Sequence, residues 1–390
     1  MGTAIVAGAR TPFGKLGGAL SSVPATTLGA LAVRAALERA GVDGNSVDDV
    51  ILGMVLQAGA GQIPSRQATM AAGLGVGVVS ETVNKVCASG MRAAFLADVL
   101  IRAGEARTVV AGGMESMSRA PYLVPGARFG YRMGDQTLVD ALQHDGLWST
   151  FDQCTMGAQG DHMAREAGIS RAEQDRWALR SHERAIAAID GGVLAEEIVP
   201  VPIAARGQTK MVETDEAPRR DTSLERLAAL RPAFTPDGSI TAGNAPGVND
   251  GACALVLMDE DEARAQGREV LARVVGHGAV SDEPYRLGTV PAAAGLRALE
   301  GAGRRAQDLR RVEVNEAFAA VTLQSVSLLG VPEEIVNVNG GAIALGHPIG
   351  ASGARILLTL VLELRRSGGG LGLCAICSGG GQGEALLVEV

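Results

Sequence analysis

The sequence predicts an α/β protein made of two related halves with a loop-rich insertion between them. Short apolar runs alternate with amphipathic helical segments, which is typical of α/β folds with mainly parallel strand pairing. Residues 88–92 (ASGMR) recur 263 positions later as residues 351–355 (ASGAR), and each copy opens an apolar helix and then a strand that ends in glycines. Residues 119–248 differ, because they hold seven of the eleven aromatic residues and a polar stretch.

The individual elements follow from the spacing of apolar residues. We expect strands at the short apolar runs of residues 4–7, 50–55, 108–111, 252–258, 272–275, 312–315, 371–378 and 385–390. We expect helices, where apolar residues recur at intervals of three and four, over residues 28–40, 91–103, 317–329 and 354–366. A further long helix is expected in the middle of the chain, where Ser170 and Glu173 have the spacing of a capping box.

These patterns divide the chain into three parts. Residues 1–118 together with residues 249–269 are expected to form the N-terminal half, and residues 270–390 the C-terminal half. Residues 119–248 are expected to form the inserted loop domain. Insertions of this kind commonly supply lids or binding loops, so we expect this one to contribute to ligand binding.

Composition excludes several classes of protein. A net charge of −8 argues against a broad nucleic-acid surface. No apolar run reaches the roughly 18 residues that a membrane span needs. The apolar run at residues 4–7 is too short for the apolar region of a signal peptide. Five cysteines, an odd number, favour free thiols and a reducing, cytoplasmic compartment. Glycine is frequent, at 53 of 390 residues, nearly twice the usual ~7%, which calls for tight turns or close backbone approaches.

Cys87 stands directly before the first copy of the repeated segment, and so before a predicted helix. A thiol at a helix N-terminus lies near unpaired N–H groups and the positive end of the helix dipole, which lower its pKa and favour the reactive thiolate. The alternative is that Cys87 is a small buried hydrophobic residue, which is the commonest fate of a free cysteine.

His347 and Asn315 also stand at strand–helix boundaries. His347 lies in residues 346–353 (GHPIGASG), just ahead of the second repeated segment. A helix N-terminus disfavours the imidazolium, so a neutral ring that accepts a thiol proton is expected there. Asn315 begins residues 315–319 (NEAFA), where it is placed to hold a water or a carbonyl oxygen. Simple N-capping of the next helix is an equally weighted alternative for Asn315.

Cys377 ends an apolar strand and opens the glycine-rich residues 377–383 (CSGGGQG). Such glycines let backbone amides approach a ligand closely. Cys374 and Cys377 form a C-x-x-C pair, but in an extended strand they point to opposite faces, and no other cysteines have zinc-motif spacing. We therefore expect no metal site and no redox dithiol. His162 and His182, on amphipathic segments, are expected at the surface.

With these motifs the chain resembles the thiolases, which are CoA-dependent acyltransferases that make or cleave 3-ketoacyl-CoA. The resemblance extends from residues 5–12 (IVAGARTP) to the last strand. It is carried, in order, by residues 84–90 (NKVCASG), 112–118 (GGMESMS), 315–320 (NEAFAA), 346–348 (GHP) and 377–383. It implies two duplicated βαβαβαββ halves in a five-layered αβαβα core with an inserted loop domain. It also implies coenzyme A and acetyl-CoA as substrates and no permanently bound cofactor.

The resemblance implies the roles of the catalytic residues. Cys87 resembles the nucleophile that becomes acylated, and His347 resembles the group that activates it. Cys377 resembles the acid/base that removes or returns a proton at the substrate α-carbon. Asn315 is expected to hold the water that, with His347, forms an oxyanion hole for the thioester enolate. The backbone amides of Cys87 and Gly379 are expected to form a second hole for the tetrahedral intermediate.

The resemblance also implies contacts to coenzyme A and the acyl group. Arg219 aligns with an arginine that meets the CoA nucleotide. The remaining expected contacts are Leu147, Met156, Phe234, Ala242, Pro246, Leu287, Ala317 and Phe318. Short-chain biosynthetic members usually have a serine at the position of Pro246, a histidine at that of Thr155 and a methionine at that of Leu287. These departures bear on acyl selectivity and leave the catalytic set unchanged.

The main functional expectation is an acetyl-CoA acetyltransferase of lipid metabolism, which joins two acetyl-CoA into acetoacetyl-CoA and CoA, or the reverse, through an acyl-Cys87 intermediate. One alternative is a 3-ketoacyl-CoA thiolase of fatty-acid β-oxidation with longer substrates, and a remote one is a non-catalytic acyl-CoA-binding protein. A decarboxylating ketosynthase would normally carry histidine or asparagine in place of Cys377. The resemblance further implies a homotetramer or dimer, and no nucleic-acid or membrane partner is expected.

Overall fold

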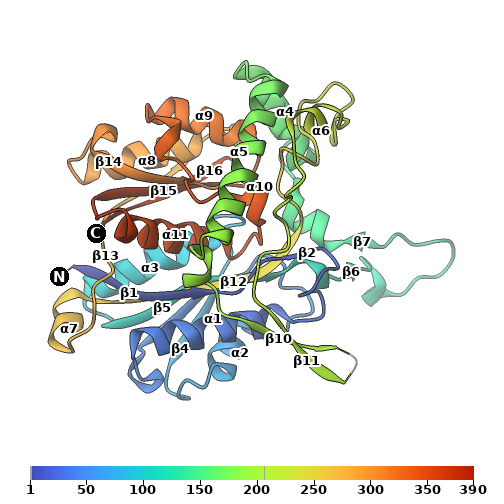
Figure 1. Cartoon of the computed structure of the whole chain (residues 1–390). Coiled ribbons are helices and arrows are strands. Elements are labelled where there is room, and N and C mark those ends of the chain that lie inside the picture. Colours follow the sequence, from blue (N-terminus) through green and yellow to red (C-terminus); the bar gives the residue numbers. More distant parts are fainter. Residues whose placement is uncertain (1, 206) are drawn as a thin grey trace.

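The computed structural model describes residues 2–205 and 207–390, and Figure 1 traces them from the N-terminal to the C-terminal strand. The strands are β1 Thr3–Arg10, β2 Gly14–Lys15, β3 Asp49–Gly53, β4 Val79–Val83, β5 Thr108–Ser116, β6 Tyr122–Leu123, β7 Val139–Asp140, β8 Trp148–Ser149, β9 Cys154–Thr155, β10 Val201–Ala205, β11 Gln208–Val212, β12 Asn249–Asp259, β13 Ala272–Ser281, β14 Leu309–Val314, β15 Leu371–Ser378 and β16 Gln382–Glu389. The helices are α1 Ala25–Ala40, α2 Pro64–Ala71, α3 Ser89–Ala103, α4 Met156–Glu166, α5 Arg171–Asp190, α6 Leu224–Ala228, α7 Glu260–Ala265, α8 Val290–Gly301, α9 Ala319–Leu329, α10 Ala342–Leu345 and α11 Ser352–Arg366.

Each predicted strand and helix overlaps an observed element. The prediction for β15 has the observed bounds, and α5 begins at a capping box in which the Ser170 side chain accepts the Glu173 N–H. The edge strand β4 was missed because its residues are exposed or half-buried, and therefore lack the apolar run of a buried strand.

The main sheet has the strand order β14-β15-β16-β13-β1-β12-β5-β3-β4. The expectation of mainly parallel pairing is wrong. Parallel pairs join β3 to β4 and β5, and β14 to β15, whereas β1, β12, β13 and β16 pair antiparallel with their neighbours. The reason is connectivity, because the short turn between β15 and β16 permits only an antiparallel hairpin, whereas parallel neighbours need a longer crossover.

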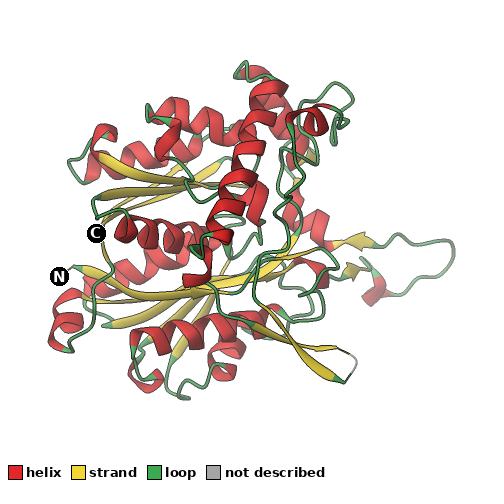
Figure 2. Ribbon diagram, viewed as in Figure 1, coloured by secondary structure: helices red, strands yellow, loops and turns green. Residues whose placement is uncertain are grey.

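Helices and sheet alternate in five layers (Figure 2). Helices α1 and α2 cover the outer face of the strands around β12, and helices α8 and α9 cover the outer face of the strands around β15. Helices α3 and α11 lie between the two parts of the sheet and contact both. This αβαβα arrangement confirms the predicted fold. The middle layer joins the halves in one buried apolar cluster, in which Met91 and Leu358 are fully buried.

The repeated segments open the two helices of the middle layer. A Cβ atom on Gly90 would lie 2.8 Å from the Ala354 nitrogen, and one on Gly353 would lie 2.4 Å from the Met91 nitrogen. Each glycine therefore lets the N-terminus of one helix touch the other. This contact brings together the two loops that precede the helices, which contain Cys87 and His347.

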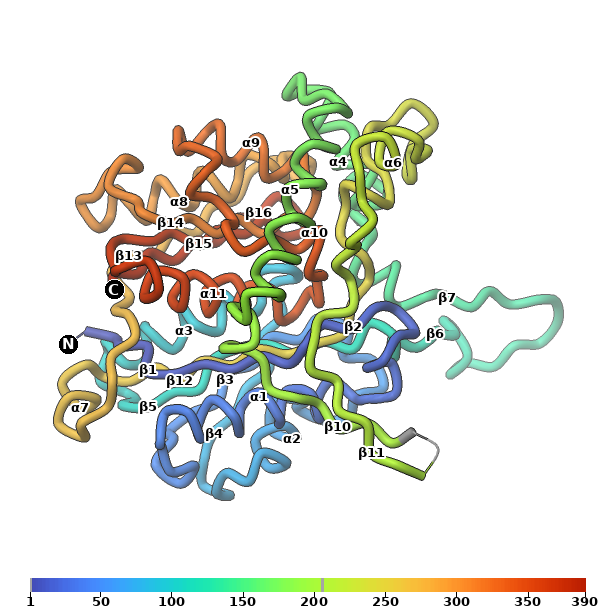
Figure 3. The backbone as a smooth tube through the Cα atoms, in the orientation of Figure 1, coloured from blue at the N-terminus to red at the C-terminus, as the bar shows by residue number. Residues whose placement is uncertain are grey.

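The insertion runs along one side of the layered core and returns into β12 (Figure 3). Between β6 and β7 it extends away from the rest of the chain as an arm. The domain boundaries given above remain a prediction, although β12 pairs with β1 and β5 of the N-terminal half. In the part of the chain described, every helix is too short or too polar to traverse a lipid bilayer.

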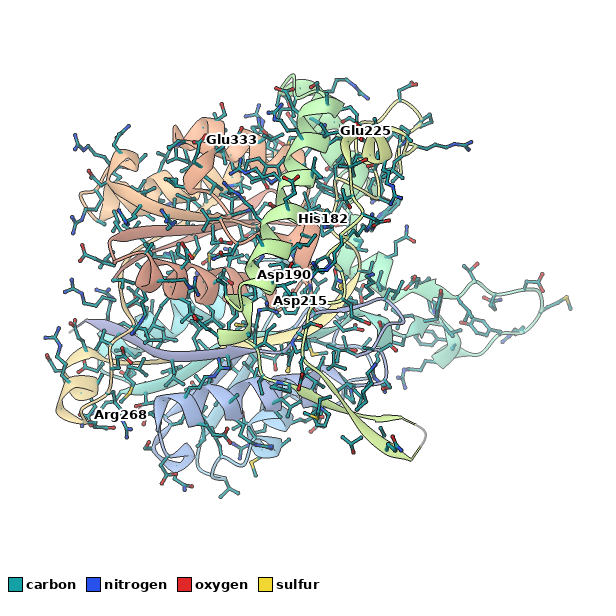
Figure 4. The ribbon with its side chains drawn as sticks, in the orientation of Figure 1. His182, Asp190, Asp215, Glu225, Arg268 and Glu333 are labelled. Atoms are coloured by element: carbon teal, nitrogen blue, oxygen red, sulfur yellow. The ribbon has the colours of Figure 1, made fainter. Side chains whose placement is uncertain are left out.

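One histidine of the insertion lies where we did not expect it. His182 on α5 (Figure 4) is only 2% exposed, so its predicted surface position is wrong, whereas His162 is exposed as predicted. The segment after β11 covers His182. The Nδ1 atom of His182 accepts the backbone N–H of Arg219, in this segment, at 3.2 Å. Burial and the charge of Arg219 lower the pKa of His182 to about 4.

Candidate active site

A cavity of about 320 Å³ lies where the loops of both halves meet the insertion. The side chains of Cys87, His347 and Cys377 all line it, together with Gly379. Its remaining walls are mostly apolar. Residues separated by up to 290 positions in the sequence therefore line one cavity.

The loop before α3 positions Cys87. The Ser89 hydroxyl accepts the N–H of Lys85 at 2.8 Å and donates to the Val86 carbonyl at 2.6 Å, which closes a tight turn. Val86 has φ 43°, a conformation that β-branched residues rarely adopt, so the turn is strained where it presents Cys87.

The pKa of the Cys87 thiol differs from the sequence prediction. Its side chain is partly exposed to the cavity, but burial by surrounding groups raises the pKa to about 12, and the charge of Glu115 raises it further. The predicted lowering of this pKa is wrong for the unliganded protein, because desolvation outweighs the helix N-terminus. Cys87 therefore holds its proton until a base removes it.

The imidazole of His347, on the same cavity, is held in one tautomer. Its Nδ1 atom lies 2.6 Å from the Ser352 hydroxyl oxygen, and this hydroxyl donates its own proton to the Pro348 carbonyl at 2.8 Å. The hydroxyl must therefore accept the N–H of Nδ1, which leaves the lone pair on Nε2. Burial, and then the charge of Arg355, lower the pKa of His347 to about 3. The predicted neutral imidazole is confirmed.

Cys377 lies at the end of β15 on the same cavity. Burial raises the pKa of its thiol, and nearby Cys87 adds to the effect. The neighbouring Ser378 hydroxyl donates to the carbonyl of Lys85 at 2.5 Å, which joins the loops of the two cysteines. Cys374 packs in a different apolar cluster from Cys377, as expected for opposite faces of one strand.

Asn315 does not cap the following helix, because α9 begins at Ala319 and its N-cap is Phe318. The capping alternative is therefore wrong. The Asn315 side chain is fully buried, and neither its amide nitrogen nor its oxygen has a hydrogen-bond partner among the described residues. A buried amide without partners is costly, so this side chain is suited to hold a water or a substrate oxygen. It is not itself part of the cavity wall.

Most of the expected substrate contacts lie on the cavity. Its lining includes Leu147, Met156, Phe234, Pro246, Leu287, Ala317 and Phe318. Arg219 and Ala242 are exposed residues outside the lining. The roles assigned to all of these residues remain predictions. Thr155 also lines the cavity, and its side chain caps α4 by accepting the Ala158 N–H at 3.2 Å.

Sequence reasoning missed part of the wall. The additional lining residues are Met117, Asp140, Leu142, Gln143, Gly146, Gly157, Ala245, Gly247, Val248 and Ile349. Ile349 follows the GHP motif directly, so its position in the sequence could have predicted that it lines the cavity. Leu142 and Gly146 belong to the π-helix Leu142–Leu147, which has no distinctive sequence pattern. Such turns are rare and occur frequently at functional sites.

A thiol, a neutral imidazole and a second thiol around one apolar cavity are suited to covalent acyl transfer. Comparison with known families gives the same class. The model of the thiolase N-terminal domain matches residues 3–261, and that of the thiolase C-terminal domain matches residues 268–390. The chain belongs to the thiolase family.

Individual relatives are similar over their whole length. The acetyl-CoA acetyltransferase of Pseudomonas aeruginosa is 50% identical over 383 residues, which cover 98% of each chain. An acetyl-CoA acetyltransferase of Escherichia coli is 48% identical over 386 residues, covering 99% of this chain and 98% of the relative. The crystal structure of the Bacillus anthracis acetyl-CoA acetyltransferase superposes with a TM-score of 0.97 at 40% identity, covering 100% of this chain and 98% of that one.

Proposed function

We propose that this thiolase is an acetyl-CoA acetyltransferase, which joins two acetyl-CoA into acetoacetyl-CoA and CoA and catalyses the reverse thiolysis. The observation that supports it is that Cys87, His347 and Cys377 line one cavity. The names of relatives that are about half identical over nearly the full chain agree with this proposal.

In the first half-reaction the thiol of Cys87 is acetylated. His347 accepts the thiol proton at Nε2, and the thiolate attacks the thioester carbonyl of acetyl-CoA. When the C–S bond to CoA breaks, Cys377 gives its proton to the departing CoA thiolate. Acetyl-Cys87, an imidazolium at His347 and a thiolate at Cys377 remain.

In the second half-reaction a carbon–carbon bond forms. The thiolate of Cys377 removes a proton from the α-carbon of a second acetyl-CoA, and the resulting enolate attacks the carbonyl of acetyl-Cys87. Collapse of the tetrahedral intermediate releases acetoacetyl-CoA and the thiolate of Cys87, which recovers its proton from His347. The raised pKa of Cys377 suits this step, because a more basic thiolate is a stronger base towards a weakly acidic C–H.

Two oxyanions develop in this scheme. We propose that Asn315, through a water, and Nε2 of His347 stabilise the enolate, while the backbone amides of Cys87 and Gly379 stabilise the tetrahedral intermediate. The amide of Asn315 and Nε2 of His347, which have no hydrogen-bond partner within residues 2–205 and 207–390, support the first assignment. Each such donor typically lowers the barrier by about 2.7–4 kcal/mol.

The proposed substrates are acyl-CoA and CoA, and the proposed steps use only side chains and backbone amides of this chain and a water, so they call for no permanently bound cofactor. Leu287, Pro246 and Thr155 on the cavity favour a second candidate, a 3-ketoacyl-CoA thiolase for longer chains. Turnover of acetoacetyl-CoA and 3-ketooctanoyl-CoA by thiolysis separates them. The acetyltransferase proposal expects acetoacetyl-CoA to have the higher kcat/KM, and the opposite order would favour the second candidate.

We also propose that the protein acts as a homo-oligomer, a tetramer or a dimer, with contacts made through the insertion. The arm between β6 and β7 exposes large apolar side chains, with Phe129 at 92% and Met133 at 94% exposure. Contiguous exposed apolar residues are typical of interaction surfaces. All five cysteines are free, which supports a reducing, cytoplasmic compartment.

A further inference from the structure

We propose that Glu115 is a positioning residue that holds the loop carrying His347 against the N-terminal half of the chain. This inference rests on the proposed function and extends it to a residue outside the reacting groups. Glu115 lies near the end of β5, within residues 112–118, a motif to which the mechanism above gives no role.

The carboxylate of Glu115 joins two separate loops. One oxygen, Oε2, accepts the backbone N–H of Val55 and the backbone N–H of Gly350, each at 3.0 Å. The other oxygen, Oε1, accepts the N–H of Leu56 at 3.2 Å. Gly350 lies only three residues after His347. The carboxylate therefore bridges the loop after β3, in the N-terminal half, to the loop of His347 in the C-terminal half.

Close backbone packing makes this bridge rigid. A Cβ atom on Gly113 would lie 1.9 Å from the Gly350 carbonyl oxygen, and one on Gly53 would lie 2.8 Å from the same atom. The strands β5 and β3 thus press their backbones directly on the loop of His347. These contacts account for part of the high glycine content, and they let the loop of His347 lie close enough to β5 for its Gly350 N–H to reach Glu115.

The residues that Glu115 holds form a wall beside the nucleophile. Val55, Leu56, Met117 and Ile349 make one buried apolar cluster, and Cys87 packs against it. Ile349 and Met117 also line the cavity. A shift of the Gly350 loop would therefore change both the placement of His347 and the shape of the cavity next to Cys87.

Glu115 also brings a charge into this region. Burial raises its pKa to about 7, the N–H groups of Val55, Leu56 and Gly350 lower it, and Asp250 on β12 raises it. No cation contributes to this balance. The charge of Glu115 in turn raises the pKa of the Cys87 thiol. Two substitutions distinguish the effect of the Glu115 charge from that of its hydrogen bonds to the loops. Gln keeps the length of the side chain without the charge, and Asp keeps the charge on a shorter side chain.

The test measures steady-state thiolysis of acetoacetyl-CoA and the alkylation of Cys87 by iodoacetamide at pH 8 on the full-length protein. In Glu115→Gln the amide oxygen can accept at most two of the three N–H groups, and the NH2 group faces the remaining donor. We therefore expect kcat to fall by about tenfold or more with KM within about twofold, as expected when reacting groups are misplaced. Alkylation of Cys87 should become about threefold faster or more, because the loss of the charge lowers the pKa of the thiol.

Glu115→Asp serves as the second variant. It keeps the charge but is too short to reach all three N–H groups, so kcat should fall while alkylation is not accelerated. Asp98→Asn is the matched control, since Asp98 is a buried carboxylate on α3 that pairs with Arg102 at 2.7 Å, away from the cavity. This variant should leave both kcat and the alkylation rate unchanged.

The proposal is overturned if folded Glu115→Gln, or folded Glu115→Asp, keeps kcat within about twofold of the unmodified protein. Failure of both variants to fold, while Asp98→Asn folds, would assign Glu115 to stability alone and would also overturn it. Thiolysis by the unmodified protein tests the proposed function separately, and the alkylation rates do not depend on that activity.

Discussion

The Nδ1 atom of His347 lies 2.6 Å from the hydroxyl oxygen of Ser352, and this hydroxyl donates a hydrogen bond to the Pro348 carbonyl. The second copy of the repeated segment thus orients the imidazole that its own loop carries. In the first copy the equivalent Ser89 bonds only to backbone groups, the N–H of Lys85 and the carbonyl of Val86. Ser89 and Ser352 occupy equivalent positions of the repeated segment. Ser89 stabilises the turn before Cys87, whereas Ser352 orients the imidazole of His347.

The first prediction follows from this bond. Ser352→Ala removes the acceptor of the Nδ1 proton, so the ring can adopt the other tautomer, in which Nε2 carries the proton and cannot accept one from Cys87. We expect kcat for thiolysis to fall by about 10- to 100-fold, less than the ~10²- to 10⁴-fold of a lost general base, because the active tautomer remains accessible. Ser325→Ala is the control, because the Ser325 hydroxyl is equally buried and bonds to the Gly288 carbonyl at 2.9 Å. Equal effects of both changes would contradict the tautomer argument.

The second prediction concerns Asn315. Asn315→Ala should lower turnover by about 10²- to 10³-fold, the usual effect of one oxyanion donor. Acylation of Cys87 should persist in part, because the proposed role of Asn315 is in the enolate step. Mass spectrometry of the protein mixed with acetyl-CoA measures the acetyl-Cys87 fraction, and the exposed Asn45→Ala serves as control. Unchanged turnover in Asn315→Ala would remove this residue from the mechanism.

The third prediction concerns thiol reactivity. Cys87 is partly exposed and lines the cavity together with His347, whereas Cys253 is fully buried. Iodoacetamide should therefore alkylate Cys87 first, and acetyl-CoA should protect it. Peptide mapping after short labelling gives both rates. If Cys87 reacts no faster than Cys253, the nucleophile assignment fails.

The fourth prediction concerns acid stability. The pKa of His182 is lowered to about 4 in the folded protein, while an unfolded chain has the ordinary value near 6.5. Between these values the unfolded state binds the extra proton, so stability falls as the pH drops from about 6.5 to 4. His182→Gln removes this dependence. From pH 7 to pH 5 the variant should therefore lose about 2 kcal/mol less of its free energy of unfolding than the unmodified protein loses.

Urea denaturation at the two pH values measures this difference. Gln can still accept the Arg219 N–H through its side-chain oxygen, which limits other effects. His162→Gln makes the same change at an exposed site and is the control. An unchanged pH slope in His182→Gln would show that His182 is protonated to the same extent in both states.

The fifth prediction tests the arm between β6 and β7. Replacing Phe129 and Met133, the most exposed apolar residues there, with serine should lower the molar mass measured by light scattering after size-exclusion chromatography. Arg132→Ser changes an exposed neighbour and should leave the mass unchanged. A double variant that keeps the mass of the unmodified protein would exclude this arm as the subunit contact.

The sequence by itself determined most strands of the main sheet, the repeated segment, and Cys87, His347 and Cys377 as residues of one site. Apolar spacing located β15 and α11 because burial of one face is a local property of the chain. The repeat at residues 88–92 and 351–355 predicted two matching helices, which the structure places in contact. The reactive residues were found because each stands next to a recognisable glycine loop or helix start.

Only the tertiary structure decided the state of those groups. The helix start before Cys87 predicts a lowered pKa, but side chains from other loops surround the thiol and raise it. Glu115 meets Gly350 across 235 positions, and His182 is buried by a segment 37 residues away. Desolvation and bridging hydrogen bonds depend on which distant segments cover a group, and no local pattern encodes that.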